Sequence, residues 1–134
     1  MQSTSSVATQ ADELAERVRR FAVRALKFVR TLPRDPSTEA VARQLAKSAP
    51  GESANYRAAR RARSPAEFVA KIGTVAEEAD ESEHWLDVLR ESGAASGSEF
   101  NWLLRESREL RAIFVASATT ARANYRRSQK SRNR

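Results

Sequence analysis

The chain has 134 residues, of which 40% are hydrophobic and 31% are charged, and its formal net charge is +7 at pH 7. A chain of this size buries one core, and the absence of cysteine excludes disulfides and thiolate metal sites. No stretch has the roughly 20 apolar residues of a membrane span. We therefore expect a single domain over residues 1–134, located in the cytoplasm and without a membrane partner.

The first predicted helix covers about residues 7–32 and starts at Val7 or Ala11. Its apolar residues are separated by alternating steps of four and three, which places them on one helical face. Pro33 and Pro36 follow it, and neither ring continues a helix from within. The predicted core face consists of Leu14, Val18, Phe21, Ala25, Phe28 and Leu32.

The second predicted helix covers about residues 37–62, with Ser37 as its N-cap. Pro50 and Gly51 fall inside it, and a proline there removes one helical hydrogen bond. We therefore expect a kink near residues 46–51, or two abutting helices. Its inward stripe includes polar residues and reads Val41, Leu45, Ser48, Glu52, Asn55 and Ala59.

The third predicted helix covers residues 64–92 and has the clearest start. Ser64 is the N-cap, Pro65 takes the first helical position, and Glu67 completes a capping box with Ser64. Gly93 is expected to adopt the left-handed conformation that ends a helix. The apolar stripe has heptad spacing at Phe68, Ile72, Val75, Ala79, Ser82, Leu86 and Leu89.

The fourth predicted helix covers about residues 98–127, and residues 128–134 are expected to form a basic, frayed tail. Its core face reads Phe100, Leu103, Ser107, Leu110, Phe114, Ala118, Ala121 and Tyr125. Short connections between all four helices force neighbours to be antiparallel. The sequence therefore predicts an all-α fold, an antiparallel up-down-up-down four-helix bundle.

Opposite charges gather on the first and third predicted helices, which lie diagonally in such a bundle. Their flanks cannot cover each other within one subunit, so each is expected to meet the opposite charge on another copy, head to tail in a ring. The alternative is that both are solvated faces. The predicted interface residues are Arg17, Arg20, Arg24, Lys27, Glu77, Glu78, Glu81 and Trp85.

Four polar residues of the second helix face the core or its edge: Gln44, Ser48, Glu52 and Asn55. Each buried polar group left without a partner costs about 1–3 kcal/mol. We therefore expect these four side chains to form a hydrogen-bonded network with the third helix.

A longer pattern, RQL-x-KS-x5-AN-Y-RAA-x-RARS-x-x-EF followed by EEADES-x-x-WL, resembles the bacterial four helix bundle protein family. Its members are similar to the protein encoded by the intervening sequence of large-subunit ribosomal RNA genes. The resemblance covers about residues 15–125 and implies a homopentameric ring with no established enzymatic activity. The fold also resembles the accessory protein of diversity-generating retroelements, a basic pentamer that works with a reverse transcriptase and nucleic acid. The segment Pro50-Gly51-Glu52 departs from the family, which has small residues there.

Catalytic and metal-binding functions find little support. Glu81 and His84 have the Glu-x-x-His spacing of di-iron bundles, but such sites need the motif twice and the chain has one histidine. Neither a cysteine nucleophile nor a glycine-rich phosphate loop is present. We expect no enzyme, no cofactor and no small-molecule substrate.

Nucleic acid is the alternative partner. Seven of the 24 Lys and Arg residues lie in residues 110–134, which have no acid, and the other 17 balance the 17 Asp and Glu residues. The candidate phosphate contacts, which would be independent of base sequence, are Arg57, Arg60, Arg61, Arg63, Arg122, Arg126 and Arg127. Arginines at a helix C-terminus are also explained by the helix dipole. The first hypothesis is thus a self-assembling scaffold or adaptor, and the second a nucleic-acid-binding accessory factor.

Overall fold

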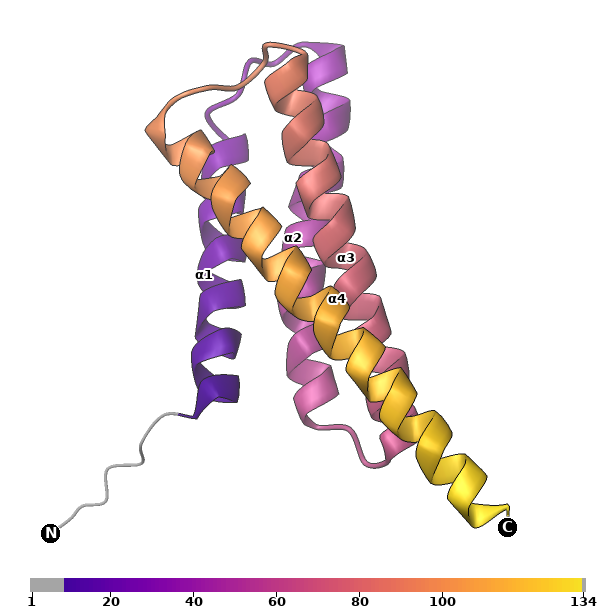
Figure 1. The fold of residues 1–134 in the computed structure, drawn as a ribbon. Coiled ribbons are helices and arrows are strands. Elements are labelled where there is room, and N and C mark those ends of the chain that lie inside the picture. Colours follow the sequence, from indigo (N-terminus) through magenta and orange to yellow (C-terminus); the bar gives the residue numbers. More distant parts are fainter. Residues whose placement is uncertain (1–8, 134) are drawn as a thin grey trace, which may run out of the picture.

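Four helices follow one another along residues 9–133, the part of the chain that this computed structural model describes (Figure 1). They are α1 (Gln10–Val29), α2 (Pro36–Arg60), α3 (Pro65–Glu91) and α4 (Ser98–Arg132). Each helix packs against the next, and α1 packs least extensively against α4, which closes the bundle. The all-α up-down bundle expected from the sequence is confirmed.

The starts of α1, α2 and α3 are set by polar side chains that accept the first backbone N–H groups. Thr9 and Asp12 form a reciprocal capping box, so α1 begins at Gln10. For α2 the prediction of Ser37 as N-cap is wrong. The Asp35 carboxylate accepts from the Thr38 N–H at 2.9 Å, and Pro36 takes the first helical position.

The predicted ends of α3 are confirmed. The Ser64 hydroxyl accepts from the Glu67 N–H at 3.1 Å, while the Glu67 carboxylate accepts from the Arg63 N–H rather than closing the box on Ser64 itself. Gly93 has a φ of +77°, a left-handed conformation that residues with a side chain rarely adopt.

Pro50 lies inside α2, which runs as one continuous helix from Pro36 to Arg60. Two abutting helices, one of the two expectations, are therefore wrong. The proline ring removes the N–H that would bind the Ala46 carbonyl. Packing against α1 and α3 on both sides keeps the helical path in spite of this missing bond.

Helix α4 is the longest, with 35 residues. At 1.5 Å per residue it spans about 52 Å, against about 40 Å for α3. The prediction of a frayed tail from residue 128 is wrong, because the helix continues through Arg132. In Figure 1, α4 crosses the bundle diagonally and its C-terminal end projects past the α2–α3 connection.

The core lies along the four predicted stripes. Tyr56 of α2 meets Phe114 of α4 across it, with ring centroids 5.1 Å apart, although these diagonal helices make no close backbone approach. Phe28 stacks on Phe100 at the other end. The largest fully buried apolar side chains are Phe21, Phe100, Phe114, Leu45, Ile72, Leu86, Leu89, Leu103 and Leu110.

Candidate interaction surfaces

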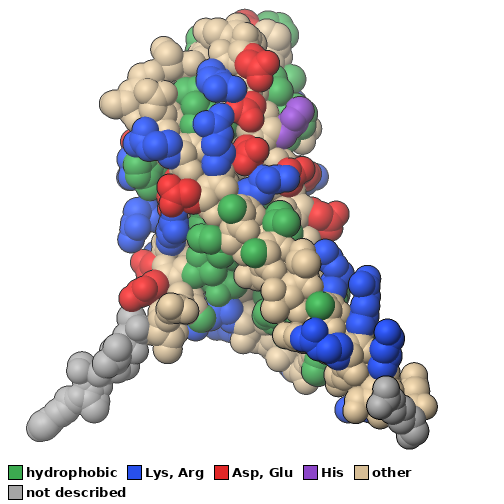
Figure 2. All heavy atoms as spheres, viewed as in Figure 1, with side chains coloured by type: hydrophobic (Ala, Val, Ile, Leu, Met, Phe, Trp, Pro, Cys, Tyr) green, Lys and Arg blue, Asp and Glu red, His purple; other side chains and the backbone are tan. Residues whose placement is uncertain are grey.

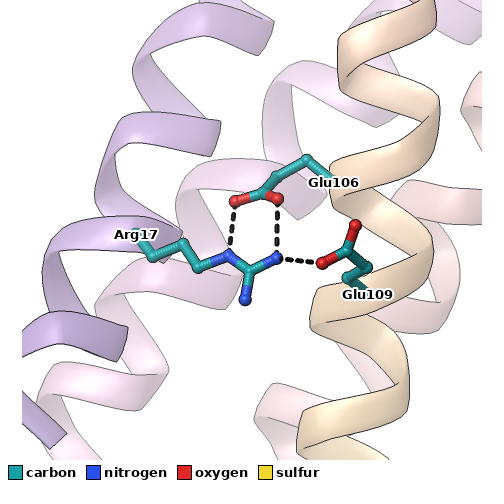
Figure 3. A network of polar contacts seen from close by, with 3 residues as sticks. All are labelled: Arg17, Glu106 and Glu109. Carbon is teal, nitrogen blue, oxygen red and sulfur yellow. Dashed lines mark hydrogen bonds and ion pairs between the residues drawn. The ribbon is translucent and has the colours of Figure 1, made fainter. Parts of the chain in front are cut away.

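The basic flank of α1 is partly used inside the subunit. The Arg17 guanidinium donates to both oxygens of Glu106, at 2.7 and 2.8 Å, and to Glu109 at 2.7 Å (Figure 3). These hydrogen bonds hold the pKa of Arg17 above its ordinary value. Glu106 is buried, so the forked contact neutralises a carboxylate that water barely reaches.

Arg24 makes a second bridge between the same helices, because its Nε and Nη2 atoms each donate to one carboxylate oxygen of Glu99. Its guanidinium also lies 3.4 Å from the centroid of the Trp102 ring, a cation–π contact. Arg17 and Arg24 are therefore already paired within the subunit, and their predicted place in a contact with another copy stays a prediction. The acids of α4 lie beside α1 and form ion pairs with both arginines. Arg20 and Lys27 remain exposed and make no ion pair among the described residues.

The acidic flank of α3 is divided in the same way. Asp80 accepts from Arg111 at 2.7 Å and Asp87 from Arg108 at 3.0 Å, so these acids hold α4. Glu77 and Glu81 are exposed and make no ion pair within residues 9–133. They remain the acidic residues that another copy could reach.

Two further residues of the predicted interface are half-buried. The Glu78 carboxylate lies over Gly51, where an added Cβ would be 2.8 Å from Oε2. Burial and the neighbouring Glu81 raise the pKa of Glu78. Trp85 packs partly against the core, and its ring lies edge-on to the His84 ring with the two centroids 4.7 Å apart.

The predicted polar network is mostly absent. Ser48 bonds to Ser82 of α3 at 2.9 Å, as expected for this pair of helices. Asn55 instead donates to the Gly51 carbonyl of its own helix at 2.9 Å, and Gln44 is exposed. Glu52 is 1% exposed, and neither carboxyl oxygen has a hydrogen-bond partner. Within residues 9–133, no side chain of α3 donates a hydrogen bond to Glu52.

Burial raises the pKa of Glu52 well above its ordinary value, and the charges of Glu78 and Glu106 raise it further. A carboxyl group in such surroundings favours the neutral form, because water is not there to solvate the charge. The sequence indicated a polar residue at this position but not that it lacks a partner.

Basic residues gather at the end of the bundle where α1 begins and α2 ends. A groove of about 480 Å³ between these helices is lined by Glu16, Arg19, Ser53, Arg57, Arg60 and Arg61. A second, shallower groove of about 400 Å³ shares Arg57 and Arg61. It adds Arg63, Lys71 and the acid Glu67. Three of the four candidate arginines of α2 and its connection are thus brought together, and Arg19 is a participant that sequence reasoning missed.

The remaining candidates lie on the projecting end of α4. Arg122, Arg126 and Arg127 are exposed, and Arg127 donates to Asn124. Figure 2 shows Lys and Arg side chains gathered along this end, while basic and acidic groups are mixed over the upper part of that face. Because α2 and α4 are diagonal, the predicted nucleic-acid contacts form two separate surfaces at the same end.

Within the described residues 9–133, no group of three His, Cys, Asp or Glu side chains is placed to hold a metal ion. Over the same range, no helix is both long and apolar enough to cross a membrane.

The chain matches no protein-family model and no curated protein. It is similar to the crystal structure, at 1.70 Å, of a protein of unknown function from the S23 ribosomal protein family of Bacteroides thetaiotaomicron VPI-5482. The TM-score is 0.73 at 22% identity, and the match covers 83% of this chain and 99% of that one. The two chains share a fold. The predicted resemblance to intervening-sequence proteins is therefore confirmed at the level of fold.

Proposed function

We propose that this chain is a non-enzymatic scaffold of the cytoplasm that assembles with copies of itself. The observation that carries the proposal is the position of the charges left over after the intramolecular pairs are formed. Arg20 and Lys27 on α1 are exposed, as are Glu77 and Glu81 on α3, and the two helices are diagonal. Opposite charges on opposite sides of one subunit favour contact between different patches of neighbouring copies.

A contact between two different patches repeats head to tail and closes into a ring when the rotation allows. A ring of five is the expectation that the family resemblance supplies. Trp85, half-buried near the acidic flank, would add apolar area at the centre of such a contact.

The proposal is tested by the mass of the native assembly, measured by light scattering at about 150 mM salt. Reversing Glu77 and Glu81 to Lys should give smaller species, and adding Arg20→Glu and Lys27→Glu on the same chain should restore the assembly. Glu39→Lys with Glu91→Lys changes the net charge equally at exposed positions at the start of α2 and the end of α3. A monomeric wild type, or equal masses for all variants, would contradict the proposal.

The second candidate is sequence-independent binding of nucleic acid along α4. It is favoured by one observation: the helix continues through Arg132, so Arg122, Arg126 and Lys130 recur every four residues on one exposed face. Neutralising these three to Gln should weaken binding of unrelated RNA and DNA. It should also reduce the slope of log affinity against log salt by about 0.7–0.9 for each phosphate that these side chains neutralise in the wild type. Absence of binding at low salt would exclude this candidate.

A further inference from the structure

The groove between α1 and α2 concentrates positive charge in a concave surface. Arg19 comes from α1, Arg57 and Arg60 come from α2, and Arg61 is the residue that caps the end of α2, with Glu16 as the one acid on the walls of the groove. Ser53, Arg57 and Arg61 follow one another at intervals of four residues. They therefore form a single row along α2 that faces α1.

Few of these charges are neutralised by the protein. Arg60 is bound to Asp12 at 2.6 Å. Arg19 and Glu16 are 3.9 Å apart, and both side chains are about 70% exposed, so this pair is weak. Arg57 and Arg61 make no ion pair among the described residues. Like charges one helical turn apart repel, so this row costs stability in the isolated subunit.

We infer that the groove binds consecutive phosphate groups. Planar guanidinium forks match phosphate oxygens with two hydrogen bonds each, and the Ser53 hydroxyl adds a donor at the end of the row. A volume of about 480 Å³ accommodates more than one phosphate. The adjoining groove adds Arg63 and Lys71, with Glu67 as its one acid, and so continues a mainly basic surface across α2. A chain of phosphates can therefore run from α1 over α2 toward α3.

Two kinds of molecule carry consecutive phosphate groups that could fill the groove: inorganic polyphosphate and the backbone of a single-stranded nucleic acid. The site is independent of the self-assembly proposed above. It is also separate from the basic face of α4, because α2 and α4 lie diagonally across the bundle. Neutralising the α4 residues should therefore leave the groove intact.

The experiment uses the full chain, with tripolyphosphate in a calorimetric titration and a labelled single-stranded oligonucleotide of one base in fluorescence anisotropy. Arg57→Gln with Arg61→Gln should weaken binding by at least about tenfold, since each charged hydrogen bond that is removed is worth that much. The matched control is Arg34→Gln with Arg43→Gln, an equal loss of charge at exposed positions away from the groove. Thermal unfolding should show that all variants stay folded, because the substituted side chains are exposed.

Loss of both probes in the groove variant alone supports a site for phosphate chains from either source. Loss of tripolyphosphate alone assigns the groove to inorganic polyphosphate, and loss of the oligonucleotide alone assigns it to nucleic acid. Equal losses in the groove and control variants, or no binding of either probe at about 50 mM salt, would overturn the inference. Oligonucleotide binding that depends only on the α4 residues, with tripolyphosphate unbound, would also overturn it while leaving the second candidate function standing.

Discussion

Replacing the buried Glu52 should make the protein more stable and less sensitive to pH. Glu52 is 1% exposed and both carboxyl oxygens lack partners. An unsatisfied buried polar group costs about 1–3 kcal/mol. Glu52→Met keeps a similar volume without that group. It should therefore raise the free energy of unfolding at pH 7 by about 1–3 kcal/mol, or the melting temperature by about 4 °C for each kcal/mol.

The pH dependence gives a second measurement with a defined sign. Because the pKa of Glu52 is higher in the folded state than its ordinary value of 4.5, the folded state holds an extra proton above that pH. Stability from this group is fully present below pH 4.5 and falls as pH rises toward the folded pKa, by about 1.4 kcal/mol per unit. Glu52→Gln should remove this slope.

The assay is urea unfolding at several pH values between about 4 and 9, monitored through Trp85 and Trp102. Glu39→Gln, at an exposed position in the first turn of α2, is the matched control for the loss of one carboxyl. The reasoning is refuted if Glu52→Met is no more stable than the wild type. It is equally refuted if the slope persists in Glu52→Gln.

Four further substitutions test the ion pairs, the packing and the capping. Arg17→Met should lower the free energy of unfolding by about 1–3 kcal/mol, because it leaves the buried Glu106 carboxylate without its partner. Glu109 has a side chain that is 63% exposed, so Glu109→Gln should change the free energy of unfolding by less than about 0.5 kcal/mol in the same denaturation assay. Gly51→Ala should stabilise α2 by up to about 1 kcal/mol in thermal unfolding, since the three atoms nearest to the added Cβ all belong to the flexible end of Glu78. A loss of stability would mean that Glu78 cannot move. Ser64→Ala should cost about 1 kcal/mol in the same assay through loss of the α3 cap, and an unchanged melting temperature would contradict the capping role.

The helices were predictable because each carries a regular apolar stripe. Every interior position of the α3 stripe, from Ile72 to Leu89, is buried as expected. Local competition decided the details. Asp35 outcompetes Ser37 for the start of α2, because it stands directly before Pro36 and its carboxylate accepts from Thr38. Helix α4 is longer than predicted, because the basic run at its end contains no helix breaker and continues the helix through Arg132.

The pairing of α1 with α4 was open to prediction from the sequence. Arg17 and Arg24 are one heptad apart, as are Glu99 and Glu106. In both observed bridges the two residue numbers add up to 123 (17 and 106, 24 and 99), as two antiparallel helices in fixed register require. The match is missed when only the acids of α3 are considered as partners for Arg17 and Arg24. The missing partner of Glu52, by contrast, depends on three-dimensional distances that no spacing rule gives.

The basic groove depends on the register between α1 and α2, and one contact fixes that register. Arg60 of α2 reaches Asp12, which also closes the capping box of Thr9 at the start of α1. These bonds lower the pKa of Asp12 from 3.8 to about 2. The carboxylate therefore stays charged, and the stability that it contributes is lost only as pH falls from about 4 toward 2. The same bridge occupies Arg60 itself. A phosphate ligand would consequently meet Arg19, Arg57 and Arg61, which makes these three, rather than the whole basic end, the residues whose loss should decide binding.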